Sequence, residues 1–450
     1  MKTGIKLTLN VLDLGEDGDG VAKVNENFCV YVPHALPGEK VSVLITESYK
    51  TYAKGKLLKI FNFSPLRVKT PCGFVELCGG CQIQQMKYSE QLILKKKIVE
   101  NCLKSFGVKV EETLPSENVF RYRNKALIPV SKDVNGNIIA GIYKKDSHEI
   151  ISCPDCKIGI KENEEIIKTV ISHLKKYGIE PYDEKTCKGV LRHVLIRKGF
   201  FTGELMVSLI VNALELPYET ELVKELTENN ENIKTVCITP NLQNTNVING
   251  KEFRTVYGGG FITDYIGSIK FKISPLSFFQ INPKQTVKLY EKVLEFADLT
   301  GKEPVFDLYC GVGTISLFLA QKAQKVYGVE IIPQAIENAK ENAAINGISN
   351  AEFLCGNAGE IFNRLVENQK VKADVVVVDP PRKGCEEELL KTVLRLKPKK
   401  FVYVSCNPVS LARDLKFLTA NGFVLEKVQP ADMFPHTAHV ETVCLLTFSS

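Results

Sequence analysis

From about residue 285 to the end, the sequence alternates between segments patterned as strands and segments patterned as helices. Strand-like runs are expected at residues 304–308, 325–329, 351–354, 374–378, 401–404 and 440–447. Such alternation is typical of a mainly parallel, doubly wound sheet, in which ligands bind beyond the carboxyl ends of the strands. We therefore expect an α/β, Rossmann-like domain over residues 271–450.

Two further parts are expected before this domain. Residues 1–60 contain short strand patterns at 6–12, 28–32, 39–48 and 52–60, separated by glycines, and such spacing predicts a small β-barrel. Residues 61–270 mix helical stretches, at 89–106 and 160–178, with strand patterns, and predict a central α+β domain.

The composition limits the functional classes. The chain has 450 residues, of which 44% are hydrophobic, and no apolar run approaches the ~18–20 residues of a membrane helix. The start has no apolar secretory core, so we expect the cytosol. In a reducing compartment, fourteen cysteines indicate metal binding or catalysis rather than disulfides.

The charge pattern favours nucleic acid only weakly. The net charge is +6, and residues 61–130 hold much of the excess, with eleven Lys or Arg against six Asp or Glu. A solvated charged helix around residues 95–97 would explain this bias equally well.

A glycine-containing loop follows the first strand of the C-terminal domain. In the string DLYCGVGT (307–314), Gly311 and Gly313 allow a tight turn close to a ligand, but the spacing differs from the GxGxxG of dinucleotide-binding domains. Glu330 ends the second strand, where an acid suits the hydroxyls of a ribose, and Asp379 follows the fourth. Together these features resemble the Rossmann-like S-adenosylmethionine-dependent methyltransferases.

Residues suited to methylation of a pyrimidine lie at the same sheet edge. Carbon 5 of uracil is a poor nucleophile until a thiolate adds at carbon 6, and a base must then remove the proton from carbon 5. Cys406 follows a strand in VSCNP (404–408), Glu441 precedes the last strand in HTAHVET (436–442), and Asp379 completes the set. The alternatives are a buried structural thiol and a solvated surface acid.

Four strings, DLYCGVGT, DPPRKG (379–384), VSCNP and FPHTAHVET (434–442), closely resemble those of the bacterial RNA uracil-5-methyltransferases, and the match is best to the ribosomal-RNA branch. The resemblance covers essentially the whole chain. It implies that Cys406 is the nucleophile, that Glu441 removes the C5 proton, and that Asp379 and Arg382 help to position the uracil. The methyl-donor contacts that it implies are Gln280 in SFFQIN (277–282), Tyr309, Glu330 and Asp379.

The RNA cytosine-5-methyltransferases form a neighbouring class. They pair their nucleophile with a Pro-Cys motif at the fourth strand, whereas this chain has Asp379-Pro-Pro-Arg382 there, without a cysteine beside it. Cytosine is therefore the less favoured base. Cys385 has no role that the resemblance assigns.

The cysteines Cys72, Cys78 and Cys81 follow each other with C-x5-C-x2-C spacing. A fourth thiolate is available from Cys153 or Cys156, and four thiolates suit either structural zinc or a [4Fe–4S] cluster. Unliganded cysteines are the remaining alternative. The resemblance implies a [4Fe–4S] cluster and favours Cys156 over Cys153. Methyl transfer is not a redox step, so we expect the cluster to be structural.

RNA contacts are expected outside the catalytic domain. The strings GDGVA (18–22) and ALPGEK (35–40) resemble those of the TRAM domain, an RNA-binding barrel. FRYRNK (120–125) and VLRHVLIR (190–197) carry basic and aromatic side chains that could hold phosphates and stack on bases, although ordinary strands with a charged face would look the same. A base paired in a duplex could not reach Cys406, so the target should be a loop or flipped-out uridine.

These observations predict a cytosolic, monomeric enzyme that methylates a uridine of 23S rRNA, with transfer RNA as the alternative substrate. Two other classes remain open. One is a non-catalytic RNA-binding protein that has kept the fold, and the other is an iron–sulfur oxidoreductase.

Overall fold

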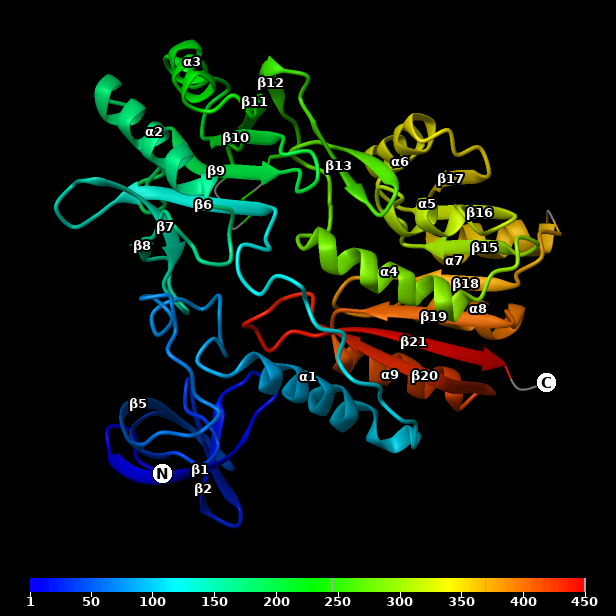
Figure 1. Cartoon of the computed structure of the whole chain (residues 1–450), viewed down its shortest axis with the longest axis horizontal. Coiled ribbons are helices and arrows are strands. Elements are labelled where there is room, and N and C mark those ends of the chain that lie inside the picture. Colours follow the sequence, from blue (N-terminus) through cyan, green and yellow to red (C-terminus); the bar gives the residue numbers. More distant parts are fainter. Residues whose placement is uncertain (244–246, 249, 369, 449–450) are drawn as a thin grey trace.

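A computed structural model describes residues 1–243, 247–248, 250–368 and 370–448 (Figure 1). The N-terminal strands lie at one end of the molecule, the middle of the chain forms a second sheet, and the last third forms a third sheet.

The first strands close into a barrel in the order β1-β2-β3-β5-β4. Their bounds are β1 Lys6–Leu14, β2 Gly20–Asn25, β3 Phe28–Val32, β4 Lys40–Ser48 and β5 Tyr52–Asn62. Alternating apolar side chains such as Val30, Val41 and Val43 point inward and are completely buried. The barrel was expected, but β2 was not, because its sequence GVAKVN has only a weak strand pattern.

The central sheet has the order β12-β11-β10-β9-β6-β7-β8. Its strands are β6 Lys125–Lys132, β7 Ile138–Tyr143, β8 Ile150–Ser152, β9 Leu191–Lys198, β10 Leu205–Val211, β11 Ile233–Pro240 and β12 Arg254–Gly258. Helices α2 (Glu162–Tyr177) and α3 (Glu219–Asn229) pack against each other and share one apolar core with this sheet. A two-stranded ribbon of β13 (Ile262–Ile266) and β14 (Ile269–Ile273) follows.

The third sheet has the order β17-β16-β15-β18-β19-β21-β20. Its strands are β15 Pro304–Leu308, β16 Lys325–Glu330, β17 Ala351–Cys355, β18 Val375–Val378, β19 Lys400–Ser405, β20 Phe423–Ala431 and β21 Glu441–Phe448. Strands β15 to β19 pair in parallel, whereas β21 is antiparallel to both β19 and β20. The expected α/β, Rossmann-like class is thus confirmed, and β20 is the one strand of this sheet that was not expected.

Helices cover both faces of this sheet. One face packs against α4 (Pro283–Ala297), α5 (Thr314–Ala320) and α6 (Pro333–Ile345). The other packs against α7 (Ala358–Asn363), α8 (Glu387–Leu396), α9 (Pro408–Thr419) and also α1 (Tyr88–Leu103), which contacts α9 and β20. Because helices cover both faces, side chains on both sides of the valine-rich strand β18 are buried.

Helix α1 therefore crosses from the barrel side to the catalytic sheet (Figure 1). The interpretation of residues 95–97 as a solvated face is wrong for Lys95, whose side chain is completely buried. Lys96 and Lys97 do lie at the surface and pair with Glu112 and Asp13. Among the described residues, no helix is both long enough and apolar enough to cross a lipid bilayer.

Candidate active site at the carboxyl edge of the third sheet

The carboxyl ends of β15, β16, β18 and β19 bring most of the predicted site residues to one edge. Tyr309 to Gly313 follow β15, Glu330 ends β16, Asp379 follows β18 and Cys406 follows β19. Glu441 reaches the same edge from the other direction, because β21 is antiparallel and begins with this residue. Four parallel strands and one antiparallel strand thus gather residues that are up to 132 positions apart, between Tyr309 and Glu441.

The glycine loop has the backbone geometry that its sequence predicts. Gly311 and Gly313 have φ angles of 54° and 83°, and a Cβ on Gly313 would lie 3.0 Å from the ring of Phe353. The carboxylate of Glu330 accepts hydrogen bonds from the backbone N–H groups of Gly311 at 3.2 Å and Ile332 at 3.0 Å. This acid is therefore fixed beside the loop.

Two predicted cofactor residues flank this loop. Tyr309 has a φ of 76°, and its hydroxyl accepts a hydrogen bond from the N–H of Glu386 at 3.3 Å. Gln280 is 9% exposed and lies just before α4, where Asn282 caps the helix and Pro283 occupies its first turn. The side-chain amide of Asn124 donates to the Gln280 carbonyl at 2.9 Å. The central sheet thereby holds the Gln280 segment against the catalytic domain.

Cys406 lies between β19 and α9 and is half-buried. The next residue, Asn407, caps α9 by accepting from the N–H of Val409 at 3.1 Å, and its amide donates to the carbonyl of Arg382 at 3.1 Å. Ser410 donates to the same carbonyl at 3.0 Å. These bonds tie the DPPR loop to the turn that carries the thiol.

Glu441 is 5% exposed and follows a loop that runs from Asp432 to Val440. Within this loop His439 is exposed, and its Nδ1 lies 3.1 Å from a guanidinium nitrogen of Arg382. The loops that carry Asp379 and Glu441 are therefore in direct contact.

Burial and nearby carboxylates raise the pKa of all three catalytic candidates. Burial, with the charges of Glu441 and Asp379, raises the pKa of Cys406 to about 11, whereas Arg382 lowers it. Burial, with the charge of Asp379, raises the pKa of Glu441 to about 8, and Arg382 again opposes this. Burial, with the charge of Asp307, raises the pKa of Asp379 to about 7. The site thus favours the neutral thiol and the two neutral carboxyl groups. Arg382 is a cation that lowers the pKa of two of the three, Cys406 and Glu441.

The predicted cluster cysteines gather at the junction of the barrel and the central sheet. A backbone bridge pairs Cys78 with Lys144, next to the hairpin of β7 and β8 that leads to Cys156. Burial raises the pKa of Cys81 to about 12, and the charges of Cys156, Cys78 and Cys72 act in the same direction. The four thiols therefore lie near one another.

Cys153 is close to the same group but is 5% exposed and packs in the core, whereas Cys156 is half-buried. No set of three Cys, His, Asp or Glu side chains in the described ranges is arranged to hold a single metal ion. The described cysteines carry free thiols and form no disulfide.

The two basic strings mainly hold the protein together. Tyr122 is completely buried and donates to the carbonyl of Pro435 at 3.1 Å, and Arg121 pairs with Asp155. Arg197 is 3% exposed and donates to the carbonyls of Pro275 and Ser277. The expectation that these strings contact RNA is therefore wrong for Tyr122 and Arg197, whose side chains are turned into the protein.

Sequence reasoning missed the residues that support the site from outside the catalytic domain. Asn124 donates to the carbonyl of Gln280, and Arg197 donates to that of Ser277. Lys95 forms a buried ion pair with Asp432. The signal for Lys95 was its place on the apolar face of α1, four residues after Gln91 and three before Ile98. The partners of Asn124 and Arg197 lie 156 and 80 residues away, and no local pattern indicates such pairs.

Comparison with known proteins agrees with this geometry. The family model described as tRNA (Uracil-5-)-methyltransferase matches residues 87–448, and that of the TRAM domain matches residues 2–58. A protein of Clostridium tetani named an uncharacterized RNA methyltransferase is 48% identical, over 100% of this chain and 97% of its own length. An uncharacterized RNA methyltransferase of Halalkalibacterium halodurans is 46% identical, over 97% of this chain and 96% of its own length.

A solved structure resembles the whole chain. The tRNA (uracil-54, C5)-methyltransferase of Pyrococcus abyssi, in complex with S-adenosyl-L-homocysteine, superposes with a TM-score of 0.79 at 31% identity. The match covers 98% of this chain and 99% of the other. The architecture of all three sheets is thus shared with that enzyme.

Proposed function

The chain belongs to the tRNA (uracil-5-)-methyltransferase family, and from this premise we propose that it transfers the methyl group of S-adenosylmethionine to C5 of a uridine in 23S rRNA. The observation that carries this proposal is the meeting of Cys406, Glu441 and Asp379 at one sheet edge, beside the glycine loop and Glu330. A thiol to add at C6, a carboxylate to remove the C5 proton and a loop beside an acid to hold the donor are the groups that methylation at C5 requires.

The first step activates the pyrimidine ring. The thiolate of Cys406 adds to C6 of the uracil, a C6–S bond forms, and the electron pair of the C5–C6 double bond moves toward C5 and O4 as an enolate. The pKa of Cys406 is raised to about 11 by burial and nearby acids, so the thiol must lose its proton to solvent as the substrate binds, which leaves Glu441 free to accept the C5 proton later. The positive charge of Arg382, which lowers this pKa, favours that loss.

The second step moves the methyl group. Gln280, Tyr309, Gly311, Gly313 and Glu330 are the residues that we assign to holding S-adenosylmethionine, with Glu330 as the acceptor for its ribose hydroxyls. When bound, this donor would supply an electrophilic methyl to C5 and leave as S-adenosylhomocysteine.

The last step restores the enzyme. Glu441 removes the proton from C5, the electrons of the C5–H bond re-form the double bond, and the C6–S bond breaks to return the thiolate. A raised pKa suits this role, because a carboxylate with a pKa of about 8 is a stronger base than an ordinary glutamate. We assign Asp379 and Arg382 to holding the uracil ring during these steps.

We further propose that Cys72, Cys78, Cys81 and Cys156 hold a [4Fe–4S] cluster. In such a cluster each thiolate binds a different iron, so the four sulfurs stand apart rather than converging on one ion. That requirement is consistent with four neighbouring thiols that form no site for a single metal ion among the described residues. The cluster would fix the loop of residues 72–81 and take no part in methyl transfer.

RNA is proposed to enter through a cavity of about 1320 Å³. Its walls come from the barrel, at Lys54 and Lys56, from the cysteine loop, at Gly79 and Gly80, and from the catalytic loop, at His439. The cavity also carries acidic side chains such as Asp19 and Glu47, and neither Cys406 nor Glu441 lines it, so a flipped-out uridine would have to pass His439 to reach the thiol. In this scheme residues 1–60 bind RNA, residues 61–270 carry the cluster and residues 271–450 catalyse, within a monomer.

The experiment that tests the substrate uses RNA that lacks 5-methyluridine. The purified protein is incubated with S-adenosylmethionine and unmodified total RNA, and new 5-methyluridines are mapped. New methylation in 23S rRNA supports the proposal. Methylation in transfer RNA alone would assign the alternative that the Pyrococcus abyssi structure favours, and no methylation of either RNA would contradict the proposal.

A further inference from the structure

The loop that precedes Glu441 begins and ends at one pair of opposed residues. Ala431, the last residue of β20, lies opposite Glu441, the first residue of β21. Asp432 is therefore one position from the residue that faces the proposed base. Contacts that hold Asp432 in place therefore also hold the start of β21 in place.

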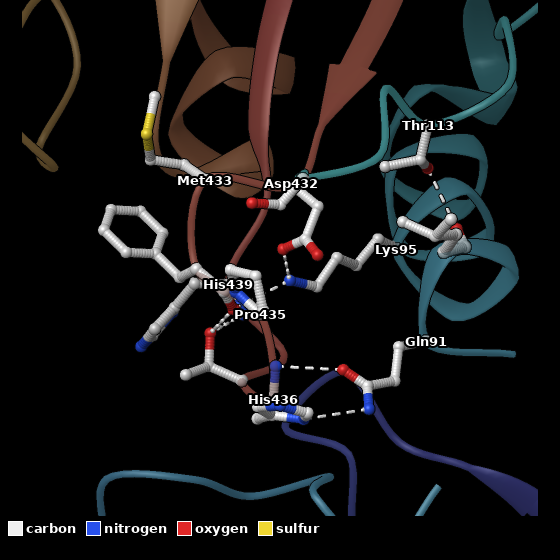
Figure 2. A network of polar contacts seen from close by, with 12 residues as sticks. Gln91, Lys95, Thr113, Asp432, Met433, Pro435, His436 and His439 are labelled. Carbon is white, nitrogen blue, oxygen red and sulfur yellow. Dashed lines mark hydrogen bonds and ion pairs between the residues drawn. The ribbon is translucent and has the colours of Figure 1, made fainter. Parts of the chain in front are cut away.

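Helix α1 holds this loop through buried polar contacts (Figure 2). The ammonium of Lys95 forms an ion pair with Asp432 and donates to the carbonyl of Phe434 at 3.0 Å, and both charged side chains are completely buried. Tyr88, at the start of α1, donates its hydroxyl to the other oxygen of Asp432 at 2.7 Å. The carboxylate therefore has two partners on one helix.

A second anchor lies one helical turn earlier. The side-chain carbonyl of Gln91 accepts from the backbone N–H of His436 at 2.9 Å, and its amide lies 3.2 Å from Nδ1 of the same residue (Figure 2). The backbone N–H of Ile83 donates to the carbonyl of His436 at 3.1 Å. A Cβ on Gly18 of the barrel would lie 2.4 Å from the side chain of Ile83 and 3.7 Å from Ala438. The turn at His436 is thus packed between α1, the cysteine loop and the barrel.

A buried ion pair contributes little to stability, because both charges lose their hydration. An apolar pair of similar size often stabilises the fold equally well. In some proteins the effect of a buried ion pair is instead to specify one arrangement of the groups that it joins. Here it joins α1 directly to the loop that ends at Glu441, whereas Cys406 is held by β19 and Asn407 and meets that loop through the pairing of Ser405 with Thr442 and the contact of Arg382 with His439. The two contacts therefore bear more directly on the base than on the nucleophile.

We propose that Lys95, Asp432 and Gln91 are positioning residues, which set the place of Glu441 for removal of the C5 proton. The proposal rests on the function proposed above. It predicts that their loss slows the final step more than the addition of Cys406 to the ring, so that the covalent protein–RNA adduct accumulates. Errors of about 1 Å in such a group cost up to ~100-fold in rate.

The decisive variant is the double substitution Lys95→Met and Asp432→Asn, because removal of one charge alone leaves the other buried without its partner. The substituted pair is neutral, and the amide oxygen introduced by Asp432→Asn would still accept from Tyr88. Gln91→Leu tests the second anchor independently. The matched control is Lys96→Met, which removes a neighbouring lysine of α1 that pairs at the surface with Glu112 and Glu100.

The wild-type protein is measured first, and its failure to methylate RNA would contradict the proposed function itself. For each variant, kcat, the KM for S-adenosylmethionine, the melting temperature and the fraction of protein in an adduct on denaturing gels are then compared, with Glu441→Gln as the reference for a stalled adduct. We expect the double variant and Gln91→Leu to lower kcat by ~10–100-fold, to keep KM within ~2-fold and to accumulate adduct. Lys96→Met should match the wild type.

The positioning role would be overturned by a wild-type kcat in the folded double variant and in Gln91→Leu. It would also be overturned by a fall in kcat without adduct, since that would place the defect before proton removal. If the double variant does not fold, Gln91→Leu alone decides between these outcomes.

Discussion

The guanidinium of Arg382 lies 3.1 Å from Nδ1 of His439, and this contact joins the loop after β18 to the loop that leads to Glu441. Arg382 lowers the pKa of both Cys406 and Glu441, against burial and the neighbouring acids that raise them. One side chain thus links the geometry of the two loops to the protonation of both proposed catalytic groups.

Replacement of Arg382 should therefore move the pH dependence of methyl transfer. Both Cys406 and Glu441 must be deprotonated to act, so activity rises with pH, and Arg382→Met raises both pKa values further. We expect the rising limb of the kcat profile to move upward by about one pH unit and the rate at pH 7.5 to fall about 10-fold. The measurement is kcat from pH 6 to 10. Lys383→Met, at the neighbouring exposed position, is the control, and an unshifted profile for Arg382→Met would refute this role.

Glu441→Gln should stabilise the fold at high pH. Burial raises the pKa of Glu441 from 4.5 to about 8, so the folded state disfavours the carboxylate. The wild type therefore loses stability as the pH rises from 4.5 to about 8, and glutamine does not. We expect a gain on the order of 5 kcal/mol at pH 9, and none below pH 4.5 from this source.

Urea unfolding of both proteins at pH 4 and pH 9 measures this difference. The control is Glu337→Gln, which replaces an exposed acid paired with Lys340. It should not raise the free energy of unfolding by this amount at either pH. Equal gains at both pH values would show that the charge of Glu441 is not the cause.

Methyl-donor affinity should depend on Glu330. Its carboxylate is already held by the N–H groups of Gly311 and Ile332, so it can accept from ribose hydroxyls without reorganisation. Glu330→Ala should raise the Kd for S-adenosylmethionine by ~10–100-fold, the usual cost of losing hydrogen bonds to a charged group. Calorimetry measures this, with the surface variant Glu352→Ala as the control. An unchanged Kd for S-adenosylmethionine would show that Glu330 does not bind the donor.

Iron and sulfide content should separate Cys156 from Cys153. Cys156 is half-buried near Cys78 and Cys81, whereas Cys153 is packed in the core. After anaerobic purification, Cys156→Ala should lose iron, sulfide and visible absorbance, and Cys153→Ala should keep them. If Cys153→Ala loses the iron and Cys156→Ala keeps it, Cys153 is the fourth ligand. If the wild type contains zinc and no sulfide, the proposal of a [4Fe–4S] cluster is contradicted.

The catalytic domain was largely predictable, because its signals are local. The strand runs ending at Leu308 and Val378 have the predicted ends, and Gly311 and Gly313 adopt the positive φ angles that their turn requires. Cys406 reaches the carboxyl edge because β19 is parallel to its neighbours, which follows from the alternation of strands and helices. Glu441 reaches the same edge because β21 runs antiparallel and begins there, which the alternation alone does not predict.

The supports of the site were not predictable in the same way. Three consecutive lysines offer a solvated helix face as one interpretation of the basic bias, and only the partner of Lys95, Asp432, 337 residues away, explains its burial. Tyr122 and Arg197 were assigned to RNA because their strings are basic, yet their partners are carbonyl groups of distant loops. Long-range polar pairs leave no periodic trace in one sequence.

The central claim is that Cys406 attacks the uracil ring before methyl transfer. The most direct measurement is the rate at which Cys406→Ala transfers labelled methyl groups from S-adenosylmethionine to unmodified RNA, with Cys385→Ala, which changes a buried thiol near the same loop, as the control. The account predicts no transfer above background for Cys406→Ala and retained transfer for Cys385→Ala. Transfer by Cys406→Ala at the wild-type rate would contradict it.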